Sequence, residues 1–129
     1  MHIIGNGVDI IKNSRINNSL KTKGFLNRIF TEKEIQQGTK LKNKINFYAK
    51  RFAAKEAFVK AIGTGFRSDI NFIDIEIKNY KNGKPYISLS KKLNNFLQKK
   101  FKIQKYKVFL SLSDEKDYSI AFVVIDKKI

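Results

Sequence analysis

One long helix, predicted from about residue 46 to residue 62, most constrains what this chain can fold into. Its second half reads RFAAKEAFVKAI from Arg51, which is rich in good helix formers and lacks proline, and Gly63 can end it in the left-handed conformation. Apolar residues surround nearly the whole cylinder, which predicts a buried helix. Charges on a buried helix must be paired or committed to a ligand, and there are four of them here: Arg51, Lys55, Glu56 and Lys60.

Two acidic residues in apolar surroundings allow more than one interpretation. Glu56 stands four residues before Lys60, so the two could form an ordinary intrahelical ion pair. Asp9 lies in the segment from Ile3 to Ile11, whose alternation is typical of a strand and whose glycines allow a neighbour to approach closely. A carboxylate there is costly unless a cation, a metal or hydrogen-bond donors meet it, and the simpler interpretation is a capping aspartate at the end of the strand.

The remaining segments alternate between strand and helix patterns. They predict an α+β fold: a mainly antiparallel sheet packed on one long buried helix and shorter helices, in a single domain over residues 1–129. The segments are a polar stretch over 13–27 with a short helix and a break at Gly24, a helix from the capping box at Thr31 to Gly38, strands over 72–80 and 86–89 joined by a turn at 82–85, a helix over 90–101, and strands over 107–113 and 118–125.

Composition limits the classes of partner and location. Lysine and arginine exceed aspartate and glutamate by 27 to 11, a formal charge of +16 that favours anionic partners: nucleic acid, phosphate-bearing small molecules, an acidic protein or a membrane surface. No apolar run approaches the roughly 20 residues of a membrane span. The start of the chain lacks the pattern of a secretory signal, and the absence of cysteine excludes thiol chemistry and fits a cytoplasmic protein.

Six short motifs follow one another between residues 3 and 125. They are GVDI at 7–10, Arg15 six residues after Asp9, FTE at 30–32, RFAAKEA at 51–57 with Lys60, GTG at 63–65 and NGKP at 82–85. Together these motifs resemble the holo-acyl-carrier-protein synthase family, the small bacterial type of 4′-phosphopantetheinyl transferase. The resemblance implies transfer of 4′-phosphopantetheine from coenzyme A to a serine of an apo acyl carrier protein, with release of adenosine 3′,5′-bisphosphate, for fatty acid biosynthesis.

The resemblance also assigns roles to individual residues. Asp9 and Glu56 would bind the required magnesium and, with Lys60, would be catalytic; magnesium usually takes only one or two protein carboxylates. Coenzyme A would be bound by Arg51, Lys60, Gly63, Thr64, Gly65, Gly83 and Pro85. The resemblance implies a homotrimer with sites between subunits, and it makes Arg15 and Arg28 the residues that meet the acidic face of the carrier protein.

Three features leave questions open. Ser113-Asp-Glu115 stands where the family commonly has Ser-His-Thr, so Asp114 replaces a histidine near the coenzyme A site, and Gly24 stands where a further basic residue is frequent. The base that deprotonates the serine is not identified: Glu56, a metal-bound water or a carboxylate of the last turn could serve. The alternatives are a catalytically impaired member of the same family or a basic, non-catalytic RNA-binding module, which would leave Asp9 and Glu56 without a role.

Overall fold

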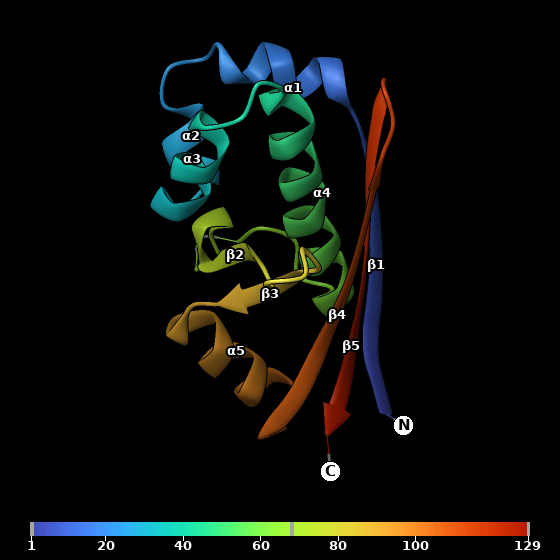
Figure 1. The fold of residues 1–129 in the computed structure, drawn as a ribbon. Coiled ribbons are helices and arrows are strands. Elements are labelled where there is room, and N and C mark those ends of the chain that lie inside the picture. The colour runs from blue at the N-terminus through green and yellow to red at the C-terminus, as the bar shows by residue number, and fades with distance from the viewer. Residues whose placement is uncertain (1, 68, 129) are drawn as a thin grey trace.

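The computed structural model describes residues 2–67 and 69–128. One long helix lies between a three-stranded sheet and a group of shorter elements (Figure 1). The strands are β1 (His2–Lys12), β2 (Ile75–Asn79), β3 (Pro85–Leu89), β4 (Lys105–Asp114) and β5 (Tyr118–Lys128). The helices are α1 (Asn13–Leu20), α2 (Phe25–Ile29), α3 (Glu32–Thr39), α4 (Lys44–Ile62) and α5 (Lys91–Phe101), with a short 3-10 turn, η1 (Phe72–Asp74). The predicted α+β class is confirmed.

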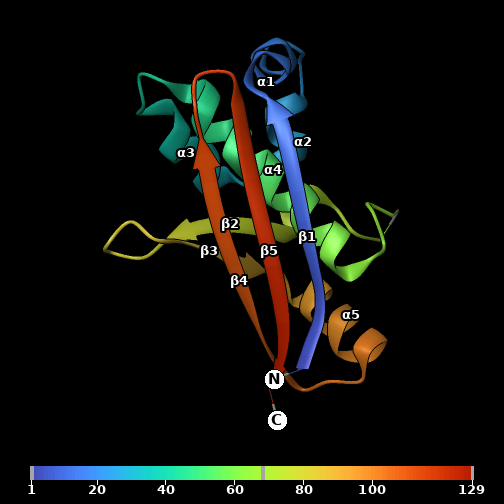
Figure 2. The same ribbon diagram turned by 90° about the vertical axis from the view of Figure 1, so that its right-hand side faces the viewer.

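The larger sheet has the order β1-β5-β4 and is antiparallel throughout. Successive residues of each strand point to opposite faces of this sheet. Gly7, Ala121 and Val123 are therefore buried on the inner face, while Val8 and Phe122 are exposed on the outer face. The helices cover one face only, and Figure 2 shows the three strands in front with no helix over them. The two last strands are each a few residues longer than the sequence predicted.

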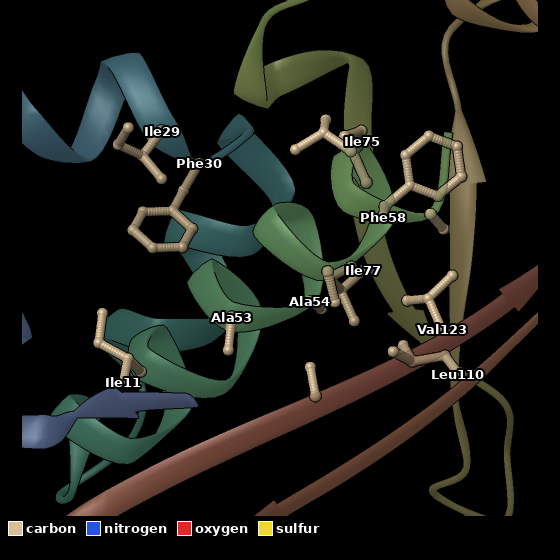
Figure 3. Close-up of a cluster of buried hydrophobic side chains, with 14 of the residues drawn as sticks. Ile11, Ile29, Phe30, Ala53, Ala54, Phe58, Ile75, Ile77, Leu110 and Val123 are labelled. Carbon is tan, nitrogen blue, oxygen red and sulfur yellow. The ribbon is translucent and has the colours of Figure 1, made fainter. Parts of the chain in front are cut away.

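The predicted central helix is confirmed as α4, which begins two residues earlier than expected and ends at Gly63 in the left-handed conformation (φ 75°). It is buried on several sides, because the sheet covers one side and η1, β2 and the short helices cover the other. Its small side chains face the sheet, where Ala53 and Ala54 are fully buried. Phe58 packs with Ile75 and Ile77 of β2 in the same core (Figure 3).

The hairpin β2–β3 forms a second, separate antiparallel pair, and its turn is closed by Tyr80 and Gly83 through backbone hydrogen bonds. The prediction of a strand from residue 72 is wrong for its first three residues, which form η1 and leave Ile73 48% exposed. The reason is that the Asp74 carboxylate accepts one hydrogen bond from the nearby Asn71 backbone NH and one from the distant Ser90 hydroxyl, which curls the chain before β2 begins.

The predicted helix breaks and caps are confirmed. Gly24 separates α1 from α2 with φ at 85°, and Thr31 caps α3 in a reciprocal capping box with Glu34. Ser90 caps α5 through the Leu93 backbone NH. Among the helices of residues 2–67 and 69–128, none combines the length and the apolar character that a membrane crossing needs.

Candidate active site

Lys60 and Asp9 meet between α4 and β1. The Lys60 ammonium donates to the Asp9 carboxylate at 3.0 Å and to the Val8 carbonyl at 3.0 Å. Asp9 lies inside β1, opposite Ala121, on the side that faces α4, so the interpretation as a capping aspartate at the strand's end is wrong. The Lys60 side chain is 54% exposed, so its ammonium remains accessible from solvent.

Glu56 lies one helical turn before Lys60, but its carboxylate is not held by Lys60 in an ion pair. Within residues 2–67 and 69–128 it receives no hydrogen bond, whereas Lys60 bonds to Asp9 instead. Burial raises the pKa of the Glu56 carboxyl, and the nearby Asp9 charge raises it further, while Lys60 partly opposes both effects. Two acids from elements 47 positions apart therefore share one electrostatic environment.

Close packing of β1 on α4 brings these acids together. A β-carbon at Gly7 would overlap the Ala57 carbonyl oxygen, and one at Gly5 would overlap the carbonyl oxygen of Ala61. Only glycine lets the strand approach the helix backbone this closely. The close approach expected from the glycines is confirmed, and it places Asp9 beside the turn that carries Glu56 and Lys60.

The residues present fit a magnesium ion. In the described part of the chain no group of three or more histidine, cysteine, aspartate or glutamate side chains could enclose a metal. A pair of acids is nevertheless what magnesium takes from proteins when phosphate oxygens and water fill its remaining positions. A cation there would offset both effects that raise the pKa of the Glu56 carboxyl, its burial and then the nearby charge of Asp9. Asp9 and Glu56 would hold the ion.

Arg51 is only 5% exposed, and its guanidinium donates to the Asn79 side chain at 2.8 Å and stacks over the Phe47 ring. Burial lowers the pKa of the Arg51 guanidinium, and the Glu34 charge partly restores it. Asn79 in turn donates to the Gly83 carbonyl at 2.9 Å. Arg51 thus links α4 to the turn that contains Gly83 and Pro85.

Two glycine-containing loops are predicted to contact coenzyme A: one follows α4 and the other joins β2 to β3. Gly63, Thr64 and Gly65 follow α4 directly, with both glycines at positive φ and the Thr64 hydroxyl bonded to the Gly65 carbonyl. Gly83 forms the exposed tip of the β2–β3 hairpin at φ 90°, and Pro85 begins β3. The first loop continues the helix that carries Glu56 and Lys60.

The predicted carrier-binding arginines both lie on exposed positions of neighbouring short helices, Arg15 on α1 and Arg28 on α2. α1 continues directly from β1, so only five residues separate Arg15 from Asp9. This arrangement presents two positive charges on helices that follow the strand carrying Asp9.

Asp114, which replaces the usual histidine, is held against α4. Its carboxylate accepts from the Asn46 amide at 2.8 Å and pairs with the Lys50 ammonium at 3.4 Å. The departure from the family pattern therefore has a local partner: a negative charge at the end of β4 is balanced by the first half of α4.

Sequence reasoning missed one buried contact. The Lys55 ammonium bonds to the Glu34 carboxylate at 2.7 Å, with both side chains almost fully buried. The sequence pattern gives Glu34 only a local role, as the residue that completes the capping box begun by Thr31. The signal that could have found the pair is Lys55 itself, since a lysine in the middle of an alanine-rich buried face requires an acid opposite it.

Comparisons with known proteins agree with this fold and site. The family model of the 4′-phosphopantetheinyl transferase superfamily matches residues 5–123. The chain belongs to this superfamily. Within it, the chain is 52% identical to the holo-[acyl-carrier-protein] synthase of Pelagibacter ubique over 128 residues, which cover 99% of this chain and 100% of that one.

Two solved structures share the fold. The holo-[acyl-carrier-protein] synthase of Neisseria meningitidis superposes with a TM-score of 0.86 at 40% identity, covering 97% of this chain and 99% of that one. The holo-(acyl-carrier-protein) synthase of Bacillus anthracis in complex with CoA (3′,5′-ADP) gives a TM-score of 0.83 at 37% identity, covering 99% of this chain and 100% of that one. The resemblance of the six motifs to this family is therefore confirmed.

Proposed function

We propose that this chain is a magnesium-dependent holo-[acyl-carrier-protein] synthase. It transfers 4′-phosphopantetheine from coenzyme A to a serine of an apo acyl carrier protein and releases adenosine 3′,5′-bisphosphate. The single observation that carries the proposal is the convergence of Asp9, Glu56 and Lys60 between β1 and α4 in a member of this superfamily. The whole chain would act as one catalytic domain.

The chemistry requires little covalent help from the protein. The serine oxygen bonds to the phosphorus that carries pantetheine, the bond from that phosphorus to the bridging oxygen breaks, and the bisphosphate leaves. Such transfers depend on positioning and on neutralising charge. Magnesium held by Asp9 and Glu56 would neutralise the diphosphate. Lys60, whose ammonium is half exposed, would steady the leaving phosphate. The serine proton would go to Glu56, to a bound water or to a carboxylate of the β4–β5 turn.

Coenzyme A binding extends the proposal to two loops. The backbone NH groups of Gly63, Thr64 and Gly65 would contact phosphates, and Gly83 and Pro85 would border the adenine end. Arg51 supports this placement through Asn79, which bonds to Gly83. Because Arg51 is buried, we infer that its contribution to binding comes through this link as well as through its charge.

Subunit association is part of the proposal. The outer face of the large sheet carries a contiguous apolar surface, which we call the outer sheet patch: Val8, Ile10, Phe109, Tyr118, Ile120 and Phe122. Pairings of Val8 with Phe122 and of Ile10 with Ile120 place these residues side by side. Exposed apolar patches of this kind mark interaction sites. We infer that copies of this chain cover it in a homotrimer whose active sites lie between subunits.

The acidic carrier protein, not nucleic acid or membrane, is the partner that this proposal requires. Arg15 and Arg28 would meet it, and opposite charges would accelerate the encounter. The RNA-binding alternative leaves unexplained why the carboxylates of Asp9 and Glu56 lie close enough to affect each other in a basic protein. The reaction would take place in the cytoplasm and serve fatty acid biosynthesis, in keeping with a chain without cysteine.

Mass spectrometry of an apo acyl carrier protein tests the proposal. The carrier is incubated with this protein and coenzyme A, with magnesium in one sample and a chelator in the other. We expect a gain of about 340 Da, the mass of one phosphopantetheine, only with magnesium. No gain with several carriers, despite binding of coenzyme A, would point to an impaired member; no binding of either partner would favour the RNA-binding alternative.

A further inference from the structure

The buried ion pair of Lys55 and Glu34 joins four separate elements at one point. The Lys55 ammonium on α4 donates at 2.7 Å both to the Glu34 carboxylate on α3 and to the carbonyl of Ile29 at the end of α2. The same carboxylate accepts the backbone NH of Thr31 at 2.9 Å and that of Ile77 on β2 at 3.0 Å. The Lys55 and Glu34 side chains are at most 1% exposed, so water does not compete for the hydrogen bonds between them.

Stability alone is a poor explanation for this pair. Replacing a buried ion pair by apolar groups of similar volume is often neutral or stabilising, whereas removing one partner is costly. Burial lowers the pKa of the Lys55 ammonium, although Glu34 opposes that effect. The pair instead provides directional hydrogen bonds, which fix the relative positions of the elements more closely than apolar packing does.

The position of Lys55 in the chain indicates which parts of the protein the pair aligns. Lys55 directly precedes Glu56, and because successive helical residues point about 100° apart, the two side chains leave α4 toward different layers. Ile29, whose carbonyl Lys55 contacts, directly follows Arg28. One ammonium group therefore connects the residue next to the proposed carrier-binding arginine to the residue next to the proposed metal ligand.

We propose that Lys55 and Glu34 are a positioning pair that sets the distance between the carrier-docking helices and the acidic pair, so that the serine of a docked carrier reaches the diphosphate. The inference rests on the proposed function, because it requires Arg28 to contact the carrier and Glu56 to act on coenzyme A. Neither member of the pair touches substrate. Their effect is on the productive geometry of the second substrate, not on the binding of the first.

Variants Lys55→Met and Lys55→Met/Glu34→Gln remove the charge pair at nearly constant volume, and Lys55→Arg keeps a cation with altered reach. Phe58→Leu is the matched control, because Phe58 is also fully buried on α4 but takes no part in the hydrogen bonds of the pair. Thermal melts identify folded variants, and Lys55→Arg carries the test if the neutral variants fail to fold. For each we measure kcat/KM for the carrier, the Kd of coenzyme A, and both again with Arg28→Ala added.

We expect kcat/KM for the carrier to fall by about tenfold or more in the Lys55 variants, since small misplacements of a reacting group are costly. The Kd of coenzyme A should stay unchanged, Phe58→Leu should change neither, and Arg28→Ala should cost less in the Lys55→Met background than in the wild type. Parallel losses for both substrates, or equal costs of Arg28→Ala in both backgrounds, would overturn the inference. A wild type that transfers nothing would instead refute the proposed function.

Discussion

Gly7 of β1 lies against the carbonyl oxygen of Ala57 on α4, so closely that no β-carbon fits between them. Gly7→Ala must therefore push the strand from the helix, which we expect to cost about 3 kcal/mol of unfolding free energy. It should also lower turnover in the protein that stays folded, because Asp9 moves with the strand. Chemical denaturation and activity at low temperature measure the two effects. Asn6→Ala, an exposed neighbour on β1, is the control and should change stability by less than about 0.5 kcal/mol.

Glu56→Gln should separate catalysis from folding. Its raised pKa means that the folded state binds the Glu56 proton more tightly than the unfolded state does. The metal-free wild type should therefore lose stability as the pH rises from the ordinary value of 4.5 through the folded pKa, whereas the variant should lack this loss.

Magnesium then supplies the second readout for Glu56→Gln. The ion should raise the Tm of the wild type at neutral pH and leave the variant unchanged, and turnover should fall by about 100-fold or more in the variant. Near-normal turnover in both Glu56→Gln and Asp9→Ala would contradict the metal site.

Arg15→Glu should weaken the carrier encounter. Reversal of an exposed charge facing an acidic partner should raise the KM for the carrier by about tenfold at low ionic strength, with a smaller effect at high salt, while the KM for coenzyme A changes little. Steady-state kinetics at two salt concentrations measure this. Lys99→Glu on the exposed face of α5 makes the same charge change away from the docking helices. A larger effect on coenzyme A than on the carrier would place the docking surface elsewhere.

Phe122→Ser should disrupt subunit association, because Phe122 is 46% exposed in the middle of the outer sheet patch. Analytical ultracentrifugation should show a trimer for the wild type and smaller species for the variant. Ile73→Ser is the control, since Ile73 is 48% exposed but lies on η1, away from the sheet. If the wild type sediments as a monomer, copies of this chain do not cover the patch.

Asp114→Ala should tighten coenzyme A binding. Asp114 stands where the family commonly has a histidine near coenzyme A, so in the proposed site its carboxylate would add negative charge, and it occupies Lys50 and Asn46, which its removal would free. Because the ion pair is about 30% exposed, its loss should cost less than about 1 kcal/mol of stability. Titration calorimetry with coenzyme A measures the change, and weaker binding in the variant would show that the Asp114 contacts support the site.

The sequence predicted most of the fold because its signals are local. Thr31 and Ser90 indicate where helices start, because each makes its capping hydrogen bond within three residues, and the glycines of β1 indicate that another element packs closely on the strand. The 3-10 turn before β2 was missed because the alternation of residues 72–80 continues through it, and Asp74 is redirected by Ser90, which lies 16 positions away. The spacing of apolar residues along the chain does not indicate such long-range contacts.

The sequence singles out the candidate site residues but does not say which of them pair with one another. Asp9, Glu56 and Lys60 were identified, yet the partner of Lys60 is Asp9 across the strand–helix interface, and Glu56 is left without it. Lys55 was recognised as a charge that needs a partner, but Glu34 could not be chosen from sequence because it already had a local role in capping α3. Contacts between elements depend on packing angles that the sequence pattern does not contain.

The contact between Lys55 and Ile29 is made to a backbone carbonyl, and this bears on how such a protein can change its partner. Residues 13–29 form one uninterrupted stretch that contains both proposed docking arginines and none of Asp9, Glu56 and Lys60. A carbonyl is present whatever side chain the residue carries. Changes on the exposed face of this stretch would therefore leave the Lys55 contact in place, as long as the buried Ile16, Phe25 and Ile29 are kept.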